Sequence, residues 1–452
     1  MSTPVPRATS APPRGSRLGD RLRTLRVSAG LTQTDLAGDR FSKEYISQIE
    51  RGKTRPTQET IMWLATRLNV DANFLASGVS SDQRARAETI LTRAEALVEV
   101  RDYDAAVEEY ANARTAIVSA GAVELHVRGL SGDAWARAHR GDVKQAIALL
   151  NEARSLAEGP QFSDIDRAEL LFRLGVARYL ISSISTSVAL LGEALSLVER
   201  SQMPSDVLRA NILTWRSRCY RRQRDFEAAR EDVERALELA EAMQDTKALG
   251  EAYFQASLIA ERDGHWVLAR TYAEKAKAQY EELTDRTNIG RLLNNLGGLE
   301  FLLGKPDQAI ARLQEAFAVV LEHGNDDEVA TVVSSLAQVH LKTGNPVKAE
   351  EHARHALSRL GSGEAPIAGA DRLDEIGNAR LVLGRALLEQ DRLDEAETAL
   401  GEAEDALAQL SSASHRAAAW VAQGDLAQRR GEDRTAAALY RRAAEALQDF
   451  RF

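Results

Sequence analysis

Residues 304–316 read GKPDQAIARLQEA, and this stretch decides the fold of most of the chain. After the turn-forming glycine, Ala309, Leu313 and Ala316 recur at helical spacing and share one face. The same arrangement returns in RDFEAAREDVERA (224–236) and DRLDEAETALGEA (391–403). The stretch is therefore one copy of a repeated helical unit.

The anchor position that Ala309 occupies recurs nine times at a nearly constant spacing. Successive anchors are separated by 40, 41, 42, 40, 40, 40, 47 and 40 residues. The long step contains GSGEAPIAGA (361–370), which we expect to form a polar loop. The nine anchors are Ala106, Ala146, Ser187, Ala229, Ala269, Ala309, Ala349, Ala396 and Ala436.

In each unit, an earlier helical stretch precedes the helix that holds the anchor. A Leu-Gly pair recurs in this earlier stretch, as in LLNNLGGLEFLLG (292–304) and NARLVLGRALLEQ (378–390). Small residues at fixed places allow two helices to approach closely, so each unit is predicted to be an antiparallel helix pair that stacks on its neighbours. The pattern resembles tetratricopeptide repeats, with helices about one turn longer than in the usual repeat of about 34 residues. The sequence thus predicts an all-α superhelix of about nine helix pairs over residues 81–452.

The charge of the chain is divided unevenly along its length. The net charge is −9, but residues 1–80 carry 12 Lys or Arg against 7 Asp or Glu, which leaves 46 against 60 in residues 81–452. Residues 1–16 are rich in proline and are expected to be a flexible basic arm. A basic head on an acidic body predicts that the head binds a polyanion.

Residues 17–56 show the pattern of three short helices. The first has Leu18, Leu22, Leu25 and Ala29 on one face and ends at Gly30. In LTQTDLAGDRFSKEYISQIERGKTRP (31–56), Thr32 and Asp35 form a capping box, residues 38–40 a tight turn, and Ser42 caps a third helix that runs to about Glu50. Phe41, Ile46 and Ile49 form the inward face of that helix, and its polar side chains point outward.

This arrangement resembles the helix-turn-helix of lambda-repressor-like (Xre-family) DNA-binding domains over residues 17–78. The resemblance rests on Leu22 to Arg26, Gly30 to Gln33, Leu36 and Ala37, Tyr45 to Gly52, Pro56 and LATRLNVDANFL (64–75). The segment between Ala37 and Ile46 is one residue shorter than is usual in the family.

The resemblance implies which side chains contact DNA. Gln33 would hold a phosphate, Lys43, Glu44 and Gln48 would face base edges, and Ser47 would reach either bases or backbone. Arg51, Lys53 and Arg55 would add phosphate contacts. The predicted DNA-binding set is Gln33, Ser42, Lys43, Glu44, Ser47, Gln48, Arg51, Lys53 and Arg55. The alternative is that these residues form only a solvated helix face.

The repeats show no constellation that predicts catalysis, a metal or a cofactor. Cys219 is the single cysteine, which excludes an intrachain disulfide and indicates a small packed residue in a reducing cytoplasm. His352 and His355, beside Glu350 and Glu351, are expected on a solvated face. No apolar run of about 18 residues predicts a membrane span. We therefore expect a cytoplasmic protein that is not an enzyme.

The first helix of each pair is expected to line a concave groove. Basic and amide side chains there could bind carboxylates or a peptide backbone, or they could be ordinary exposed residues of a charged solenoid. The predicted groove residues are Asn211, Arg218, Arg221, Arg222, Arg262, Arg291, Asn294, Gln338 and Lys342.

A helix-turn-helix followed by tetratricopeptide repeats resembles the layout of RRNPP peptide-sensing regulators. That resemblance implies a homodimer that binds double-stranded DNA and a short peptide in the groove. A lone domain reads few base pairs, so pairing two of them about 34 Å apart also favours a dimer. The alternative function is an interaction scaffold whose repeats bind a partner protein, with the helix-turn-helix as an accessory module.

Overall fold

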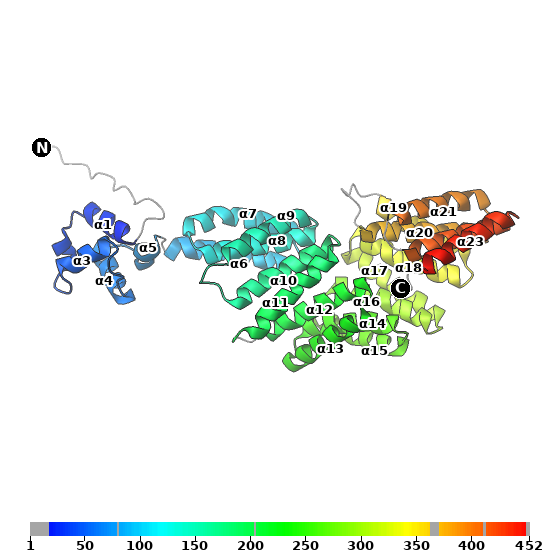
Figure 1. The fold of residues 1–452 in the computed structure, drawn as a ribbon, viewed down its shortest axis with the longest axis horizontal. Coiled ribbons are helices and arrows are strands. Elements are labelled where there is room, and N and C mark those ends of the chain that lie inside the picture. Colours follow the sequence, from blue (N-terminus) through cyan, green and yellow to red (C-terminus); the bar gives the residue numbers. More distant parts are fainter. Residues whose placement is uncertain (1–17, 79–80, 203–204, 362–369, 410–412, 449–452) are drawn as a thin grey trace. The chain divides into compact units, whose positions relative to one another are not determined.

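The computed structural model describes residues 18–78, 81–202, 205–361, 370–409 and 413–448 (Figure 1). Within these ranges it contains 23 helices and no strand, which confirms the all-α fold class. The expected basic arm (1–16), most of the 361–370 insertion and the last four residues lie outside the described residues. The helices form two compact parts, α1–α10 up to Leu180 and α11–α23 from Ile181, and each is described by itself.

The N-terminal domain consists of α1 (Leu18–Ser28), α2 (Gln33–Ala37), α3 (Lys43–Glu50), α4 (Gln58–Leu68) and α5 (Ala72–Ser77). Its core is made of fully buried Leu22, Leu36, Ile46, Leu64 and Leu75 with Ile49 beside them. The predicted inward face of α3 is confirmed, and half-buried Phe41 packs edge-on against Trp63 with ring centroids 5.1 Å apart. The prediction for Ala29 is wrong: α1 ends at Ser28, so Ala29 has left the helix and is exposed.

The predicted caps of α2 and α3 are present. Thr32 and Asp35 form a reciprocal capping box, in which the Asp35 amide donates to Thr32 Oγ1 at 3.1 Å. The Tyr45 amide donates to Ser42 Oγ at 3.1 Å. Gly38, with φ +55°, turns the chain between the two helices in a backbone conformation that favours glycine. These caps and this turn fix where α3 begins.

The repeat helices of the first part are α6 (Ser81–Glu99), α7 (Tyr103–Ala120), α8 (Val123–Arg140), α9 (Val143–Leu156) and α10 (Asp164–Leu180). α6 packs against α7 and α8 against α9, and α7 contacts α8 as α9 contacts α10. Neighbouring pairs therefore bury each other's apolar faces, as stacked repeats require.

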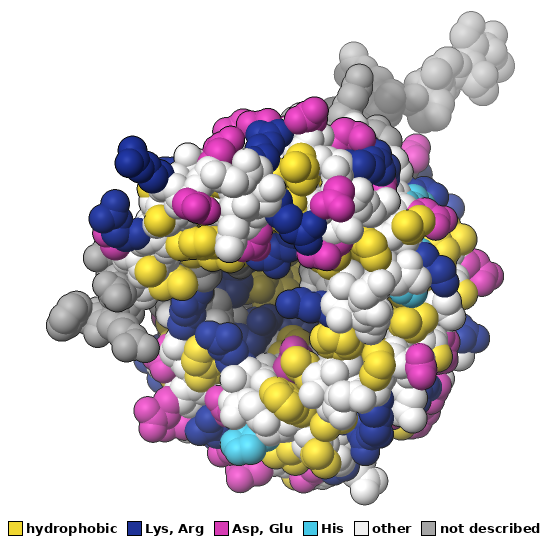
Figure 2. All heavy atoms as spheres, turned by 90° about the vertical axis from the view of Figure 1, so that its right-hand side faces the viewer, with side chains coloured by type: hydrophobic (Ala, Val, Ile, Leu, Met, Phe, Trp, Pro, Cys, Tyr) yellow, Lys and Arg dark blue, Asp and Glu magenta, His cyan; other side chains and the backbone are white. Residues whose placement is uncertain are grey.

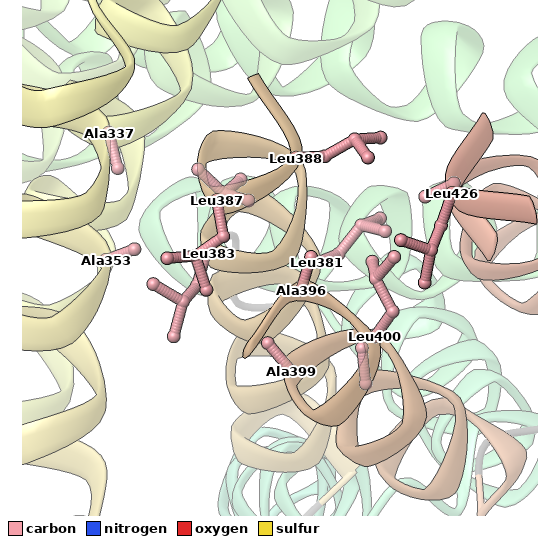
Figure 3. Close-up of a cluster of buried hydrophobic side chains, with 13 residues drawn as sticks. Ala337, Ala353, Leu381, Leu383, Leu387, Leu388, Ala396, Ala399, Leu400 and Leu426 are labelled. Carbon is pink, nitrogen blue, oxygen red and sulfur yellow. The ribbon is translucent and has the colours of Figure 1, made fainter. Parts of the chain in front are cut away.

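The second part continues the same alternation. Its helices are α11 (Ile184–Arg200), α12 (Asp206–Gln223), α13 (Phe226–Met243), α14 (Thr246–Arg262), α15 (Trp266–Glu282), α16 (Arg286–Leu302), α17 (Pro306–His323), α18 (Asp326–Lys342), α19 (Pro346–Gly361), α20 (Ala370–Glu389), α21 (Leu393–Ala408), α22 (Ala413–Arg429) and α23 (Asp433–Gln448). From α12 on, each even-numbered helix packs against the next odd-numbered one. Figure 3 shows the core near the end, where Leu383 and Leu387 of α20 face Ala337 and Ala353 of α18 and α19.

The anchor positions are small residues buried in the helix pairs. Every anchor lies in the second helix of its unit, and its side chain is at most 4% exposed. Opposite them, a Cβ on Gly297 would lie 2.6 Å from Leu313, and one on Gly384 would lie 2.5 Å from Leu400. The recurrent Leu-Gly pair thus reflects close helix approach, as predicted.

No helix in the described segments has both the length and the apolar character needed to cross a bilayer.

Candidate nucleic-acid interface and repeat groove

The outer face of α3 carries a row of polar side chains. Lys43, Glu44 and Gln48 are exposed and Ser47 is half-buried, while Ile46 and Ile49 are buried on the opposite face. Ser42 is exposed and uses its hydroxyl to cap the helix. The structure therefore brings the predicted base-facing residues together on one short helix, with their backbone fixed by the core behind it.

The turn after α3 places three cations beside that row. Gly52 adopts φ +68°, its amide donates to the Ile49 carbonyl at 2.9 Å, and the Lys53 amide donates to the Gln48 carbonyl at 2.9 Å. This pattern is a Schellman motif, which ends a helix in one defined geometry. Arg51, Lys53 and the nearby Arg55 are all exposed along the turn.

The side chain of Gln48 is oriented by the same turn. Thr54 Oγ1 donates to Gln48 Oε1 at 3.0 Å. Because this bond occupies the carbonyl end of the amide, the NH₂ group of Gln48 is the end available to donate to an acceptor on a base edge.

A buried ion pair connects the three helices behind the polar row. Arg26 of α1 donates to both carboxylate oxygens of Glu50 at 2.6 and 3.2 Å, and Gln33 of α2 donates to the same carboxylate at 2.8 Å. The Arg26 and Glu50 side chains are only 12% and 4% exposed. The hydrogen bonds that Arg26 donates to Glu50 raise the pKa of Arg26. This cluster fixes the position of α3 relative to α1 and α2.

The sequence prediction missed this role of Glu50. A signal was present, because Glu50 follows Ile46 by four residues and therefore shares its inward face. Gln33, predicted to hold a phosphate, contributes one amide hydrogen to Glu50 instead, and its phosphate contact stays a prediction.

The predicted groove residues all lie on the first helices of successive pairs in the second part. Asn211, Arg218, Arg221 and Arg222 are on α12, Arg262 on α14, Arg291 and Asn294 on α16, and Gln338 and Lys342 on α18. The 40-residue repeat gives one register position to Arg222, Arg262 and Lys342, a second to Arg218 and Gln338, and a third to Asn211 and Arg291. Arg221 and Asn294 have no counterpart in the predicted set.

Several of these cations already have partners within the chain. Arg218 bonds Glu251 of α14 at 2.5 Å and lies 4.6 Å from the centroid of the Trp215 ring. Arg291 is paired with Glu328 of α18 at 2.8 Å. Arg262 lies over the Phe226 ring at 5.3 Å. These contacts tie neighbouring helices together and reduce what the cations can offer a ligand.

Asn294 differs from the arginines in this respect. Its Oδ1 atom is buried and makes no hydrogen bond to the described residues. One turn further along α16, the Cβ position of Gly298 has open space around it, so the backbone there is accessible. An unsatisfied amide next to accessible backbone can accept a hydrogen bond from a bound molecule.

The expectation that His352 lies on a solvated face is wrong. His352 of α19 is half-buried, and its ring stacks on that of buried His340 of α18 with centroids 5.4 Å apart. Burial lowers the pKa of both histidines. His355 of α19 is half-buried as well, with its ring centroid 5.9 Å from that of Phe317, so it also departs from the expected solvated face. Cys219 is buried with its Sγ 3.2 Å from Ser187 Oγ.

One face of the molecule is hollowed, and Lys and Arg side chains gather in that hollow (Figure 2). In the second part, Lys342 lines a cavity of about 550 Å³ formed by α18, α20 and α22. A basic hollow is therefore present within a body whose net charge is negative.

Comparison with known proteins identifies both kinds of domain. Residues 17–76 match the model of a helix-turn-helix domain, and residues 210–243, 248–322 and 288–361 match tetratricopeptide-repeat models. The HTH-type transcriptional regulator DdrOP3 of Deinococcus deserti is 40% identical over 74 residues, which are 16% of this chain. The match spans 57% of the length of that relative.

Two solved structures share the fold over most of the chain. A Rap protein complexed with competence and sporulation factor aligns with TM-score 0.56 and 15% identity, covering 81% of this chain and 98% of its own. The apo form of the quorum sensor NprR from B. thuringiensis aligns with TM-score 0.57 and 12% identity, covering 80% and 99%. At these low sequence identities, the similarity shows a shared fold and nothing more.

These matches confirm the domain composition expected from the sequence. The chain therefore combines a helix-turn-helix domain with C-terminal tetratricopeptide repeats, and its fold is similar to that of the quorum sensor NprR.

Proposed function

We propose that this protein is a sequence-specific DNA-binding transcriptional regulator of the cytoplasm, whose repeats bind a ligand and pair two copies into a homodimer. One observation carries the proposal: Lys43, Glu44 and Gln48 project from one face of α3, and the buried pair of Arg26 and Glu50 holds that helix in place. A side-chain row fixed in this way is what base reading requires, because specificity depends on donors and acceptors held at defined positions.

The chemistry of the row suits the major groove. A helix can enter this groove, where amide and cationic side chains bond the edges of adenine and guanine. Arg51, Lys53 and Arg55 are placed to contact the flanking phosphates, which fix register but carry no sequence information. The match to a transcriptional regulator over this domain supports the same role.

A homodimer follows from the small footprint of one such domain. Two domains bound to successive turns of the duplex would read two half-sites whose centres are about 34 Å apart. We infer that the operator is an inverted repeat with that spacing.

A short peptide is the ligand that the repeat architecture suggests most directly. The fold is shared with a Rap protein solved with competence and sporulation factor and with the quorum sensor NprR, and Asn294 offers an unsatisfied amide oxygen to a peptide N–H. We infer that the ligand alters DNA binding through the repeats.

Selection of genomic fragments by the purified full-length chain at physiological salt tests the proposal. A regulator is expected to enrich a small set of fragments that share an inverted repeat. An interaction scaffold would enrich none, because its binding to DNA would be non-specific and would collapse as salt rises. The second result, obtained with and without cell extract as a ligand source, would contradict the proposed function.

A further inference from the structure

The cavity between α18, α20 and α22 has a regular origin in the repeat. Lys342, Glu389 and Arg429 line it and occupy equivalent positions, 47 and 40 residues apart, which are the spacings of the corresponding anchors. Leu341 and Leu388 line it one residue earlier in the same register. The cavity is therefore the continuation of the predicted groove into the last three helix pairs.

The acidic groups of this cavity are already engaged. Asp425 accepts a hydrogen bond from the Tyr440 hydroxyl at 2.8 Å. Arg429 bonds Asp391 at 2.8 Å and lies 3.8 Å from Glu389. Glu389 and Arg429 are thus paired within the protein, whereas Asp425 has a hydrogen-bond partner but no ion pair to a described residue.

Two cations of the cavity lack such compensation. Within the described ranges, Lys342 makes no hydrogen bond or ion pair, and its side chain is exposed. Arg385 of α20 makes one long hydrogen bond, from Nη2 to the Ala418 carbonyl at 3.4 Å, and no ion pair to a described residue. Arg385 holds the position equivalent to the predicted groove residue Gln338, 47 residues earlier. The positive charge of the groove is thus concentrated here, and not at Arg218 or Arg291.

The same cavity has an apolar wall. Leu388 is only 4% exposed, and Leu341 is half-buried beside it. A volume of about 550 Å³ falls within the range of sites for small ligands and is too small for a folded partner. A guanidinium and an ammonium beside leucines form a combination that recognises an anionic group attached to an apolar chain.

We propose that this cavity binds the carboxylate of a small amphiphile, with Lys342 and Arg385 on the carboxylate and Leu341 and Leu388 against its apolar chain. The proposal rests on the ligand-sensing role given above and specifies its site and chemistry. Such a carboxylate could belong to a free aliphatic acid or to the C-terminus of a short apolar peptide, and the two sources differ in the backbone amides that the peptide carries.

Calorimetric titration of the full-length protein with defined probes tests this site. The probes are octanoate and N-acetyl-leucyl-leucine, each compared with its neutral amide. At least one acid is expected to bind, with its amide at least tenfold weaker. Lys342→Gln and Arg385→Gln should each weaken binding of that acid at least tenfold. Lys247→Gln, the same change at an exposed lysine of α14, should leave it unchanged.

The stronger of the two acids identifies the source of the carboxylate. Equal binding of acids and amides, no binding of either acid, or unchanged affinity in both cavity variants would overturn the proposal. The genomic selection is an independent readout: a chain that binds the acid but enriches no DNA would refute the regulator and keep the site. A chain that enriches an operator but binds neither acid would support the regulator and refute the site.

Discussion

Under the proposed function, side chains of α3 are expected to read bases, and side chains of the turn after α3 are expected to contact phosphates. Gln48 presents its NH₂ group outward because Thr54 occupies its carbonyl oxygen, whereas Arg51 lies in the turn that follows. Gln48→Ala is expected to weaken operator binding by about 1–3 kcal/mol and to relax preference at one base pair. Arg51→Ala should weaken binding to operator and random DNA alike and reduce the salt slope by about one.

Fluorescence anisotropy with labelled operator and scrambled duplexes measures both effects. Gln314→Ala, at an exposed glutamine of α17, is the matched control and should change neither affinity. If Gln48→Ala lowers affinity for both duplexes by the same factor, Gln48 is not a base-reading residue.

Glu50 is expected to contribute to the stability of the domain and not to contact DNA, because it lies inside the domain. Glu50→Ala leaves the largely buried Arg26 guanidinium without its carboxylate, and breaking such a pair costs about 3 kcal/mol. Glu59→Ala removes a carboxylate from the exposed pair with Arg40 and should cost less than about 1 kcal/mol. Hydrogen exchange of amides in α3 should therefore be accelerated about 100-fold by Glu50→Ala and little by Glu59→Ala. Equal acceleration in both variants would show that the buried pair does not hold α3.

Within one repeat element, two adjacent glycines of α16 have opposite surroundings. A Cβ on Gly297 would lie 2.6 Å from Leu313 of α17, whereas a Cβ on Gly298 meets nothing within 4 Å. Gly297→Ala should therefore force α16 and α17 apart and cost about 1–3 kcal/mol. Gly298→Ala should be neutral or stabilising by up to about 1 kcal/mol, because alanine favours helix.

Thermal unfolding of the two alanine variants gives this comparison directly. The melting temperature of Gly297→Ala should fall below that of Gly298→Ala. The reverse order would mean that the small residue is not needed for close packing of the pair.

A second element-scale prediction concerns the stacked histidines of α18 and α19. Burial, the nearby ring and Lys348 lower the pKa of His340, and Glu351 opposes this shift. Because the folded pKa lies below the ordinary value of 6.5, the unfolded chain takes up protons first as pH falls. Stability is therefore fully present above pH 6.5 and is lost as pH decreases below it.

Urea unfolding at pH 7.5 and 5.5 measures this loss. His352→Gln should reduce the difference between the two pH values, whereas His323→Gln, at an exposed histidine, should leave it as in the unchanged protein. If His352→Gln and the unchanged protein lose the same stability, the histidine pair is not the source of the pH dependence.

At the scale of the whole molecule, periodicity made most of the architecture predictable. The regular anchors and the capping signals of Thr32 and Ser42 specify local geometry, so helix pairs and the start of α3 could be placed from the sequence. Charge partners could not be placed, because Arg218 and Glu251 lie 33 residues apart and meet only through stacking of adjacent pairs. For the same reason the sequence could not show that Arg218 and Arg291 of the predicted groove are paired with carboxylates, and it missed Arg385.

The central claim concerns the whole molecule, namely that the chain distinguishes one DNA sequence from others. The most direct test is the ratio of dissociation constants for random and selected duplexes, measured with the full-length protein at about 150 mM salt. A regulator that reads bases through α3 should bind the selected duplex at least about 10³-fold more tightly. A ratio near one, with both affinities falling steeply as salt rises, would contradict the account.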